Sequence, residues 1–342
     1  MKHADNRKIQ MMRLIWIFFV ALAFAGCGRK SDGGVGDGGV AGKVNGAADA
    51  RNADGEPASM ADGGELPLPA IPSTLESSSE RSAYVVEHFW DAMDFSDTLR
   101  SHDRDFLELN FSNFVYLLPY APPASAEKAV TLLMGKAETD KGAFLLLAAL
   151  AEKYLSEPNS PMRNEDLFIY FLRSQTAATV LDDTEKMRAR SLLRMASKNR
   201  PGMRAADFEY TGRDGRHHTL YGTKSSERML LVFYDPECEH CAEITASLAA
   251  NGVLDELQGE GRLTVLAIDT ESNREVWERT KDKMPQHWIV GHDAKGAING
   301  RGLYSLPAMP VLYLLDADKT VILKDATPEA AEMKLSELRI KN

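Results

Sequence analysis

Two of the chain's three cysteines, Cys238 and Cys241, are separated by two residues in a C-x-x-C pattern. An apolar run typical of a buried strand precedes them at residues 229–233, and a segment of good helix formers follows at residues 242–250. Cys238 is therefore expected at the N-terminus of a helix, where free N–H groups and the helix dipole favour a thiolate. Cys241 should lie within the first turn, able to attack a mixed disulfide at Cys238. The pattern predicts thiol–disulfide chemistry.

The cysteine pair also has metal-binding and structural interpretations. Cys238 and Cys241 form a Cys2His2 set with His287 and His292, but the gap to His287 is far longer than the roughly 12–15 residues of a zinc finger. A soft ion such as copper(I) could bind Cys238, His240 and Cys241. A purely structural disulfide would close a very small loop and gain little stability. We expect redox chemistry, with no metal ion and no organic cofactor.

The N-terminus predicts a signal peptide over residues 1–26. Basic residues are followed by an apolar run at residues 14–26, which is too short for an ordinary membrane span. The run ends in Phe24-Ala-Gly-Cys27, which resembles a bacterial lipobox with Phe24 where leucine is usual. The resemblance implies that Cys27 becomes the diacylated N-terminus of the mature protein. The alternative is ordinary signal cleavage with a free Cys27.

Residues 27–78 are expected to form a flexible tether behind this anchor. The stretch after Cys27 is rich in Gly, Ala and Asp and has no aromatic residue, so it buries too little apolar surface to offset its chain entropy. No acidic cluster follows Cys27 directly, which favours a location in the cell envelope facing the periplasm. The tether would let a soluble head range over the membrane surface.

Residues 79–200 predict an all-α domain. Apolar residues recur at helical spacing, and prolines within 119–123 and 158–161 interrupt the pattern. The segment from Arg81 to Phe95 resembles the opening of a helical domain that precedes a thioredoxin-like domain in Bacteroidota lipoproteins. Helices are expected, among others, at residues 125–136, 142–156, 165–178 and 183–197.

Residues 201–342 alternate strand and helix patterns, as in an α/β or α+β sheet domain. Asp214-Gly215 indicates a hairpin between two short strands. Ser272, with Glu275 three residues later, predicts a capped helix that continues to about Lys283. Pro328 suits the first position of a final helix. Further strands are expected at residues 229–235, 262–269, 310–316 and 319–324.

This order of elements resembles the thioredoxin fold of TlpA/ResA-like proteins of bacterial envelopes. The most specific features are the strand, C-x-x-C and helix unit and the Met309-Pro310 pair before a later strand. In that family the proline is cis and faces the disulfide, so the resemblance assigns this role to Pro310 and substrate-binding backbone bonds to Met309. Pro307 is the competing candidate, three residues further from the strand. Other matching residues are Trp288, Asp293 and Tyr304.

Two departures from thioredoxin itself concern the site. Val232 stands where thioredoxin has a buried aspartate, six residues before the first cysteine, so another group or a water must handle the proton of Cys241. The residues between the cysteines are Glu239 and His240 instead of Gly and Pro. We expect His240 to stabilise the Cys238 thiolate, and Glu239 to contact the substrate together with the backbone described above.

The formal net charge of −10 argues against nucleic acid as a partner. The residues together predict a lipid-anchored thiol–disulfide oxidoreductase. The resemblance to TlpA/ResA-like proteins implies that it reduces protein disulfides and receives electrons from a membrane thiol donor. One competing class is a partner-binding protein in which the thioredoxin-like part is only a scaffold, although a scaffold would not need both cysteines. The soft-metal carrier is the other.

The lipobox interpretation predicts the effect of Cys27→Ser. Because the acyl chains attach to the cysteine sulfur and its amino group, the substitution should abolish labelling by radioactive fatty acid and leave an uncleaved precursor on a denaturing gel. Labelling that survives the substitution would eliminate this interpretation.

Overall fold

The computed structural model describes residues 64–340, so the predicted signal, Cys27 and most of the predicted tether lie outside the described residues. The chain forms two compact units. One ends at residue 155 and also includes 177–180, and the other comprises 156–176 and the chain from residue 181 onward. Within residues 64–340, no helix combines the length and the apolar character needed to cross a bilayer.

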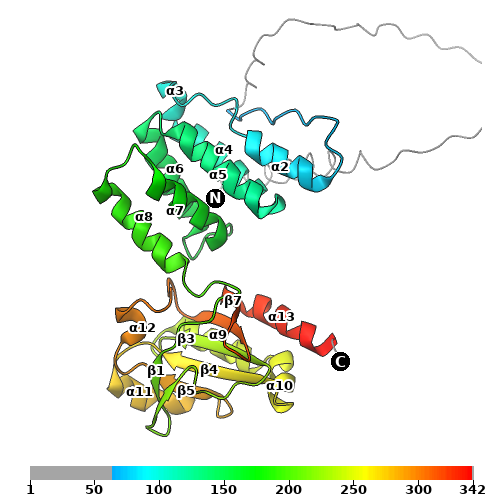
Figure 1. The fold of residues 1–342 in the computed structure, drawn as a ribbon. Helices are drawn as coiled ribbons and strands as arrows, with labels where there is room; N and C mark the ends of the chain where they lie inside the picture. Colours follow the sequence, from blue (N-terminus) through cyan, green and yellow to red (C-terminus); the bar gives the residue numbers. More distant parts are fainter. Residues whose placement is uncertain (1–63, 341–342) are drawn as a thin grey trace, which may run out of the picture. The chain divides into compact units, whose positions relative to one another are not determined.

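The first unit is helical, as the sequence predicts (Figure 1). Its two longest helices match the expected segments 125–136 and 142–156 within two residues at each end. The chain is helical at α2 (Ser78–His88), α3 (Thr98–Ser101), α4 (Arg104–Leu117), η1 (Leu118–Tyr120), α5 (Pro123–Ala137) and α6 (Lys141–Leu155).

Capping and aromatic packing hold this unit together. Ser77 and Glu80 form a capping box at the start of α2, which satisfies two backbone N–H groups that the helix leaves unpaired. The buried rings of Phe89 and Trp90 lie 5.5 and 6.0 Å from Phe114 of α4. These distances are typical of favourable aromatic pairs, so α2 and α4 share one apolar core.

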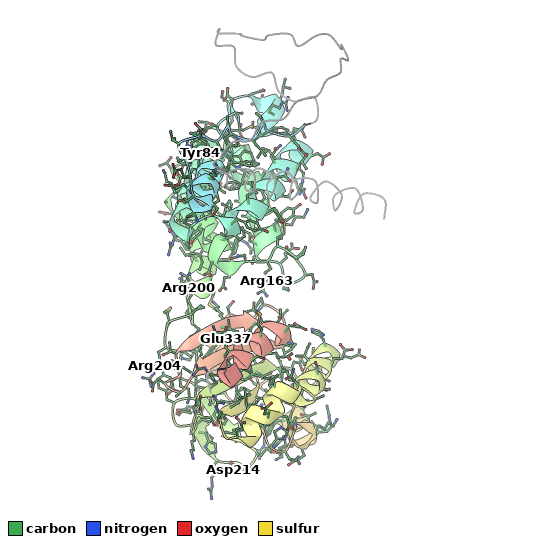
Figure 2. All side chains as sticks on the ribbon, turned by 90° about the vertical axis from the view of Figure 1, so that its right-hand side faces the viewer. Tyr84, Arg163, Arg200, Arg204, Asp214 and Glu337 are labelled. Atoms are coloured by element: carbon green, nitrogen blue, oxygen red, sulfur yellow. The ribbon has the colours of Figure 1, made fainter. Side chains whose placement is uncertain are left out.

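The second unit begins with two further helices, α7 (Glu165–Ala177) and α8 (Asp183–Ala196). Lys324 ties both to the sheet of this unit, because its ammonium group lies 2.7 Å from Glu165 and donates to the carbonyl of Ala196. Arg163 pairs with Asp325, and Arg200 pairs with Asp166 at 2.6 Å. Figure 2 labels the two arginines. Several charged contacts therefore fix α7 and α8 within the second unit.

A seven-stranded sheet in the order β2-β1-β5-β4-β3-β6-β7 forms the centre of the second unit (Figure 1). The β3–β4 and β4–β5 pairs are parallel, and the remaining pairs are antiparallel. The strands are β1 (Glu209–Gly212), β2 (His217–Thr219), β3 (Arg228–Tyr234), β4 (Leu263–Asp269), β5 (Ile289–His292), β6 (Val311–Asp316) and β7 (Val321–Ala326).

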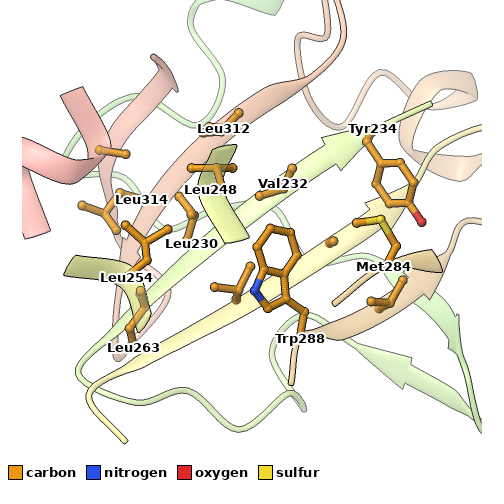
Figure 3. Packing of buried hydrophobic residues seen from close by; sticks show 14 of the residues in the cluster. Leu230, Val232, Tyr234, Leu248, Leu254, Leu263, Met284, Trp288, Leu312 and Leu314 are labelled. Atoms are coloured by element: carbon orange, nitrogen blue, oxygen red, sulfur yellow. The ribbon is translucent and has the colours of Figure 1, made fainter. Parts of the chain in front are cut away.

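Both faces of β3 are buried, which explains why its sequence is continuously apolar. Leu230, Val232 and Tyr234 point to one face, where α9 (Glu239–Ala249), α10 (Gly252–Gly259), α11 (Arg274–Thr280) and α13 (Pro328–Ile340) contribute apolar side chains (Figure 3). Alternate residues, including Phe233, point to the opposite face together with Ile298 of α12 (Ala297–Gly300). The central strand thus belongs to two separate cores.

The predicted start of the helix after β4 was wrong by one residue. Asn273, and not Ser272, caps α11, because its side-chain oxygen accepts the N–H groups of Glu275 and Val276 at 3.1 and 3.3 Å. The α-helix ends at Thr280 and continues as the 3-10 helix η2 (Lys281–Lys283). Strand β5, α10 and α12 were not predicted, whereas Pro328 does begin the last helix.

The close packing of β5 against β1 predicts the effect of Gly291→Ala. A Cβ atom on Gly291 would lie 2.2 Å from Cδ2 of Tyr210, a buried ring whose hydroxyl contacts Thr223 at 2.7 Å. We expect a loss of about 1–3 kcal/mol in the free energy of unfolding, measured by urea titration with near-ultraviolet circular dichroism.

Gly259→Ala is the matched control, because nothing lies within 4 Å of the Cβ position on this exposed residue of α10. It should stabilise the protein by about 0.5–1 kcal/mol. Equal effects of the two substitutions would contradict the packing described here.

Candidate active site

The two cysteines lie where β3 ends and α9 begins, as the sequence predicts. Asp235 shapes the turn, since its side chain accepts the N–H of Glu237 at 2.8 Å and its carbonyl accepts the N–H of Cys238 at 3.2 Å. Cys238 is the N-cap of α9, and its Sγ accepts the N–H of Cys241 at 3.3 Å. A sulfur in this position receives partial positive charge from the helix terminus.

The environments of the two thiols differ. Both are free, but Cys238 is half-buried whereas Cys241 is 1% exposed. Burial, together with the neighbouring Cys238 sulfur, raises the pKa of Cys241 to about 12, although the backbone N–H of Asp235 partly offsets these effects. Cys241 therefore keeps its proton at neutral pH, whereas Cys238 is partly exposed to solvent.

The two residues between the cysteines are exposed on the first turn of α9. Nδ1 of His240 lies 3.4 Å from Oε2 of Glu243, so its nearest charged partner in this structure is a carboxylate. Glu239 projects from the helix N-terminus and remains exposed. Just before the cysteines, Glu237 pairs with Arg279 of α11 at 2.8 Å, which links the turn to the neighbouring helix.

The Met309-Pro310 peptide bond is cis, as the family resemblance implies. Phe233 pairs with Val311, so the antiparallel register places Pro310 beside Tyr234, at the end of β3 from which the cysteine turn departs. Met309 is partly buried and packs against both core clusters. The structure thus brings the predicted proline and the cysteine turn together at the same end of the neighbouring strands β3 and β6. Pro307, the competing candidate, is exposed.

A pocket of about 320 Å³ adjoins the cysteines. It lies between the start of α9 and the segment that follows α11, and three alanines of α9 leave it open. The hydroxyl of Tyr234 is buried in this region and has no hydrogen-bond partner among the described residues. The lining comprises Tyr234, Asp235, Pro236, Cys238, Cys241, Ala242, Thr245, Ala246, Ala249, Thr280, Lys283, Met284 and Pro285.

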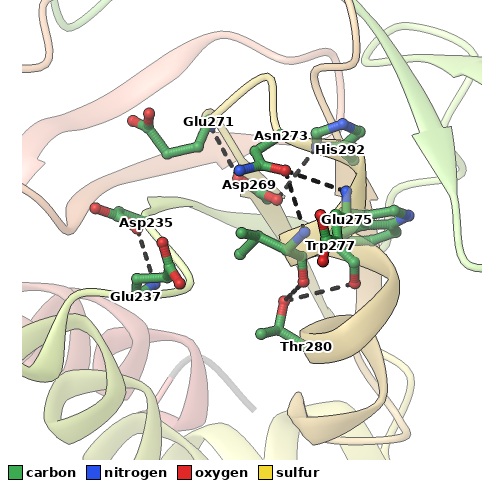
Figure 4. A network of polar contacts seen from close by, with 10 residues as sticks. Asp235, Glu237, Asp269, Glu271, Asn273, Glu275, Trp277, Thr280 and His292 are labelled. Carbon is green, nitrogen blue, oxygen red and sulfur yellow. Dashed lines mark hydrogen bonds and ion pairs between the residues drawn. The ribbon is translucent and has the colours of Figure 1, made fainter.

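A buried polar network lies beside this pocket at the carboxyl ends of β4 and β5 (Figure 4). Asp269 is 0% exposed, accepts the N–H of Glu271 at 2.8 Å and faces Nδ1 of His292 at 3.2 Å. The His292 ring stacks on Trp277 with centroids 5.4 Å apart. Burial, together with the charges of Asp235 and Asp269, raises the pKa of Glu271. Sequence reasoning missed this network, although Asp269 is a conspicuous acid at the end of an apolar run.

Arg213 was also missed by the sequence reasoning. From the turn between β1 and β2 its guanidinium donates to the carbonyls of Lys281, Met284, Pro285 and Trp288, at 2.8 to 3.4 Å. Five hydrogen bonds from one planar group hold the segment that forms one wall of the pocket.

The zinc interpretation finds no support in the geometry. His292 faces Asp269 and stacks on Trp277, so it is not directed at the cysteines. Across residues 64–340, no three or more His, Cys, Asp and Glu side chains gather in a way that could hold a metal ion. His240 remains near the cysteines in sequence, but its Nδ1 faces Glu243.

Comparison with known sequences finds one family match, in the N-terminal part of the chain. Residues 44–199 match a family model described as a domain of unknown function, DUF5106. No curated protein matches the chain.

One solved structure is similar to a larger part of the chain than this family model covers. A thioredoxin-like protein from Bacteroides caccae is 36% identical, covers 80% of this chain and 98% of its own, and has a TM-score of 0.76. A C-terminal domain of an uncharacterized protein from Bacteroides fragilis is 37% identical, covers 41% of this chain and 99% of its own, and has a TM-score of 0.40. A domain of a possible thiol-disulfide isomerase from Cytophaga hutchinsonii is 24% identical, covers 42% of this chain and 97% of its own, and has a TM-score of 0.37. On the strength of the first likeness, the chain belongs to the family of thioredoxin-like proteins.

Proposed function

We propose that this protein is a thiol–disulfide oxidoreductase that reduces disulfide bonds in proteins. The observation that carries the proposal is the asymmetry of the cysteine pair. A half-buried sulfur caps α9 at Cys238, and a buried thiol with a raised pKa lies one turn later at Cys241. This division suits an attacking and a resolving thiol.

The reaction proceeds in two thiol–disulfide exchanges. The Cys238 thiolate attacks one sulfur of the substrate disulfide, a mixed disulfide forms, and the other substrate sulfur leaves as a thiolate that takes a proton from water. Cys241 then loses its proton to solvent and attacks Sγ of Cys238. The Cys238–Cys241 disulfide forms, and the second substrate sulfur leaves and is protonated. The substrate gains two electrons, and the enzyme loses two.

The remaining predicted residues have supporting roles in this proposal. Pro310 shapes the groove in which an extended substrate lies, and Met309 contributes backbone hydrogen bonds to it. Glu239 contacts the substrate at the mouth of the site. His240, when protonated, stabilises the Cys238 thiolate, in competition with Glu243, which lies 3.4 Å from its ring.

The cellular setting belongs to the same proposal. A lipid anchor at Cys27 holds the protein to a membrane of the cell envelope, with the sheet unit facing the periplasm. A membrane thiol donor reduces the Cys238–Cys241 disulfide after each turnover, and the partners are thiols and disulfides of other envelope proteins.

The order of attack predicts different behaviour of two single variants. Cys241→Ser should accumulate partner proteins as mixed disulfides, because Cys238 still attacks but nothing resolves the product. Cys238→Ser should trap none, because its remaining thiol is buried and protonated. The measurement compares reducing and non-reducing gels of material captured from the envelope, and equal trapping by both variants would refute the assignment.

The charges around Cys238 predict a moderate redox potential. A protonated His240 favours the thiolate and Glu239 opposes it, and since both are exposed, neither effect should exceed roughly 1–2 kcal/mol. We expect a potential between roughly −270 and −180 mV, measured by titration against glutathione. A value near about −120 mV, that of a strong oxidant, would rule out a reductant.

His240→Pro serves as the comparison in this titration, because it removes the imidazole and leaves both cysteines in place. A potential identical to that of the parent protein would remove His240 from the mechanism.

A further inference from the structure

Tyr234 is the last residue of β3 and contributes a buried phenol to the wall of the cysteine pocket. The residue is 3% exposed, and its hydroxyl finds no hydrogen-bond partner among the described residues. It shares both the pocket and the core cluster with Cys241. Figure 3 shows the hydroxyl end of the ring turned outward from the packed leucines and toward Met284. A buried donor without an acceptor is costly, so its position requires an explanation.

Charged groups from several elements surround this corner of the pocket. Asp235 follows Tyr234 directly, and Asp269 is its register partner at the end of β4. Arg213 donates from the β1–β2 turn to carbonyls of the segment that forms one wall of the pocket, and Lys283 of η2 also lines the pocket. Burial raises the pKa of Tyr234, and the nearby charges of Asp269 and the Cys241 sulfur raise it further, while Arg213 lowers it. The phenol therefore keeps its proton, and remains a hydrogen-bond donor, over the pH range in which thiols react.

We propose, on the basis of the oxidoreductase function proposed above, that Tyr234 is a further catalytic residue whose hydroxyl donates a hydrogen bond to the Cys241 thiolate as it attacks the mixed disulfide. Val232 occupies the position of the thioredoxin aspartate, so the resolving thiol has no carboxylate there. A phenol in the same pocket stabilises the anion once it forms. It neither gains nor loses a proton; the Cys241 proton leaves to water and the departing substrate thiolate takes one up.

Asp269 and His292 form a buried pair on the strands beside this donor. The Asp269 carboxylate is held by the N–H of Glu271 and by Nδ1 of His292, and lies in register with Tyr234 on the neighbouring strand. Its charge opposes ionisation of the phenol. The negative charge that develops during resolution therefore resides on sulfur, and the phenol keeps its proton.

The test uses the full chain carrying Cys27→Ser, so that Cys238 and Cys241 are the only thiols, and the chromogenic disulfide dithiobis(nitrobenzoate). The first nitrothiolate released reports attack by Cys238, and the second reports resolution by Cys241. Tyr234→Phe should leave the first release unchanged and slow the second about tenfold or more at a given pH, because a hydrogen bond to an anion is lost. The pH profile of the second release should shift upward by about one unit.

Tyr313→Phe is the matched control. Tyr313 is 0% exposed, its hydroxyl also lacks a partner among the described residues, and it lies on the next strand but faces the other core. Removing an unpartnered buried hydroxyl should not destabilise either variant, which thermal unfolding checks.

The outcomes separate the two proposals. A parent protein that releases no nitrothiolate would defeat the oxidoreductase function itself. A reactive parent with equal second-release rates in Tyr234→Phe and Tyr313→Phe would defeat the role of Tyr234 alone. Slowing of both releases in Tyr234→Phe would show a general distortion of the site and would likewise overturn the assignment.

Discussion

The hydrogen bond from the Cys241 N–H to Sγ of Cys238 is the contact on which the proposed chemistry depends. It exists because α9 begins immediately after Cys238, so that the cysteine sulfur takes the place of a capping oxygen. The position at which α9 begins depends in turn on β3. This strand is buried on both faces and pairs with β4 and β6 in one fixed register, so its last residue is fixed in place. A shift of one residue would exchange the two faces of β3 and move Tyr234 away from the pocket.

The Cys241 thiol is surrounded by groups of different charge. Burial makes Cys241 hard to ionise, yet resolution of a mixed disulfide requires its thiolate. The acids near the pocket, including Asp235, Asp269 and Glu271, carry the wrong charge to stabilise an anion. A neutral donor avoids that repulsion, and Tyr234 is the buried residue of this pocket whose hydroxyl has no partner among residues 64–340. Burial, together with the charge of Asp269, raises the pKa of Tyr234 and so keeps the phenol protonated.

The frame around the site is held by polar contacts between distant segments. Arg213 joins the β1–β2 turn to the pocket wall through carbonyl groups, which no change of side chain in that wall can remove. Lys324 joins β7 to α7 and α8, and it is almost fully buried in doing so. Breaking such a buried charged contact by removing one partner is costly, so these segments hold their places. The turn that carries the two cysteines leaves Cys238 partly exposed.

The sequence by itself determined the elements whose signals are local. Apolar periodicity located α5 to α8 within two residues at each end, and the strand, C-x-x-C and helix unit placed both thiols correctly. The family resemblance identified the cis bond at Pro310. Only the tertiary structure decided the contacts between remote residues. Asp269 meets His292 across 23 positions because β5 inserts beside β4, an order that periodicity does not encode. The choice of Asn273 over Ser272 as a cap depended likewise on backbone geometry, since both residue types can cap a helix.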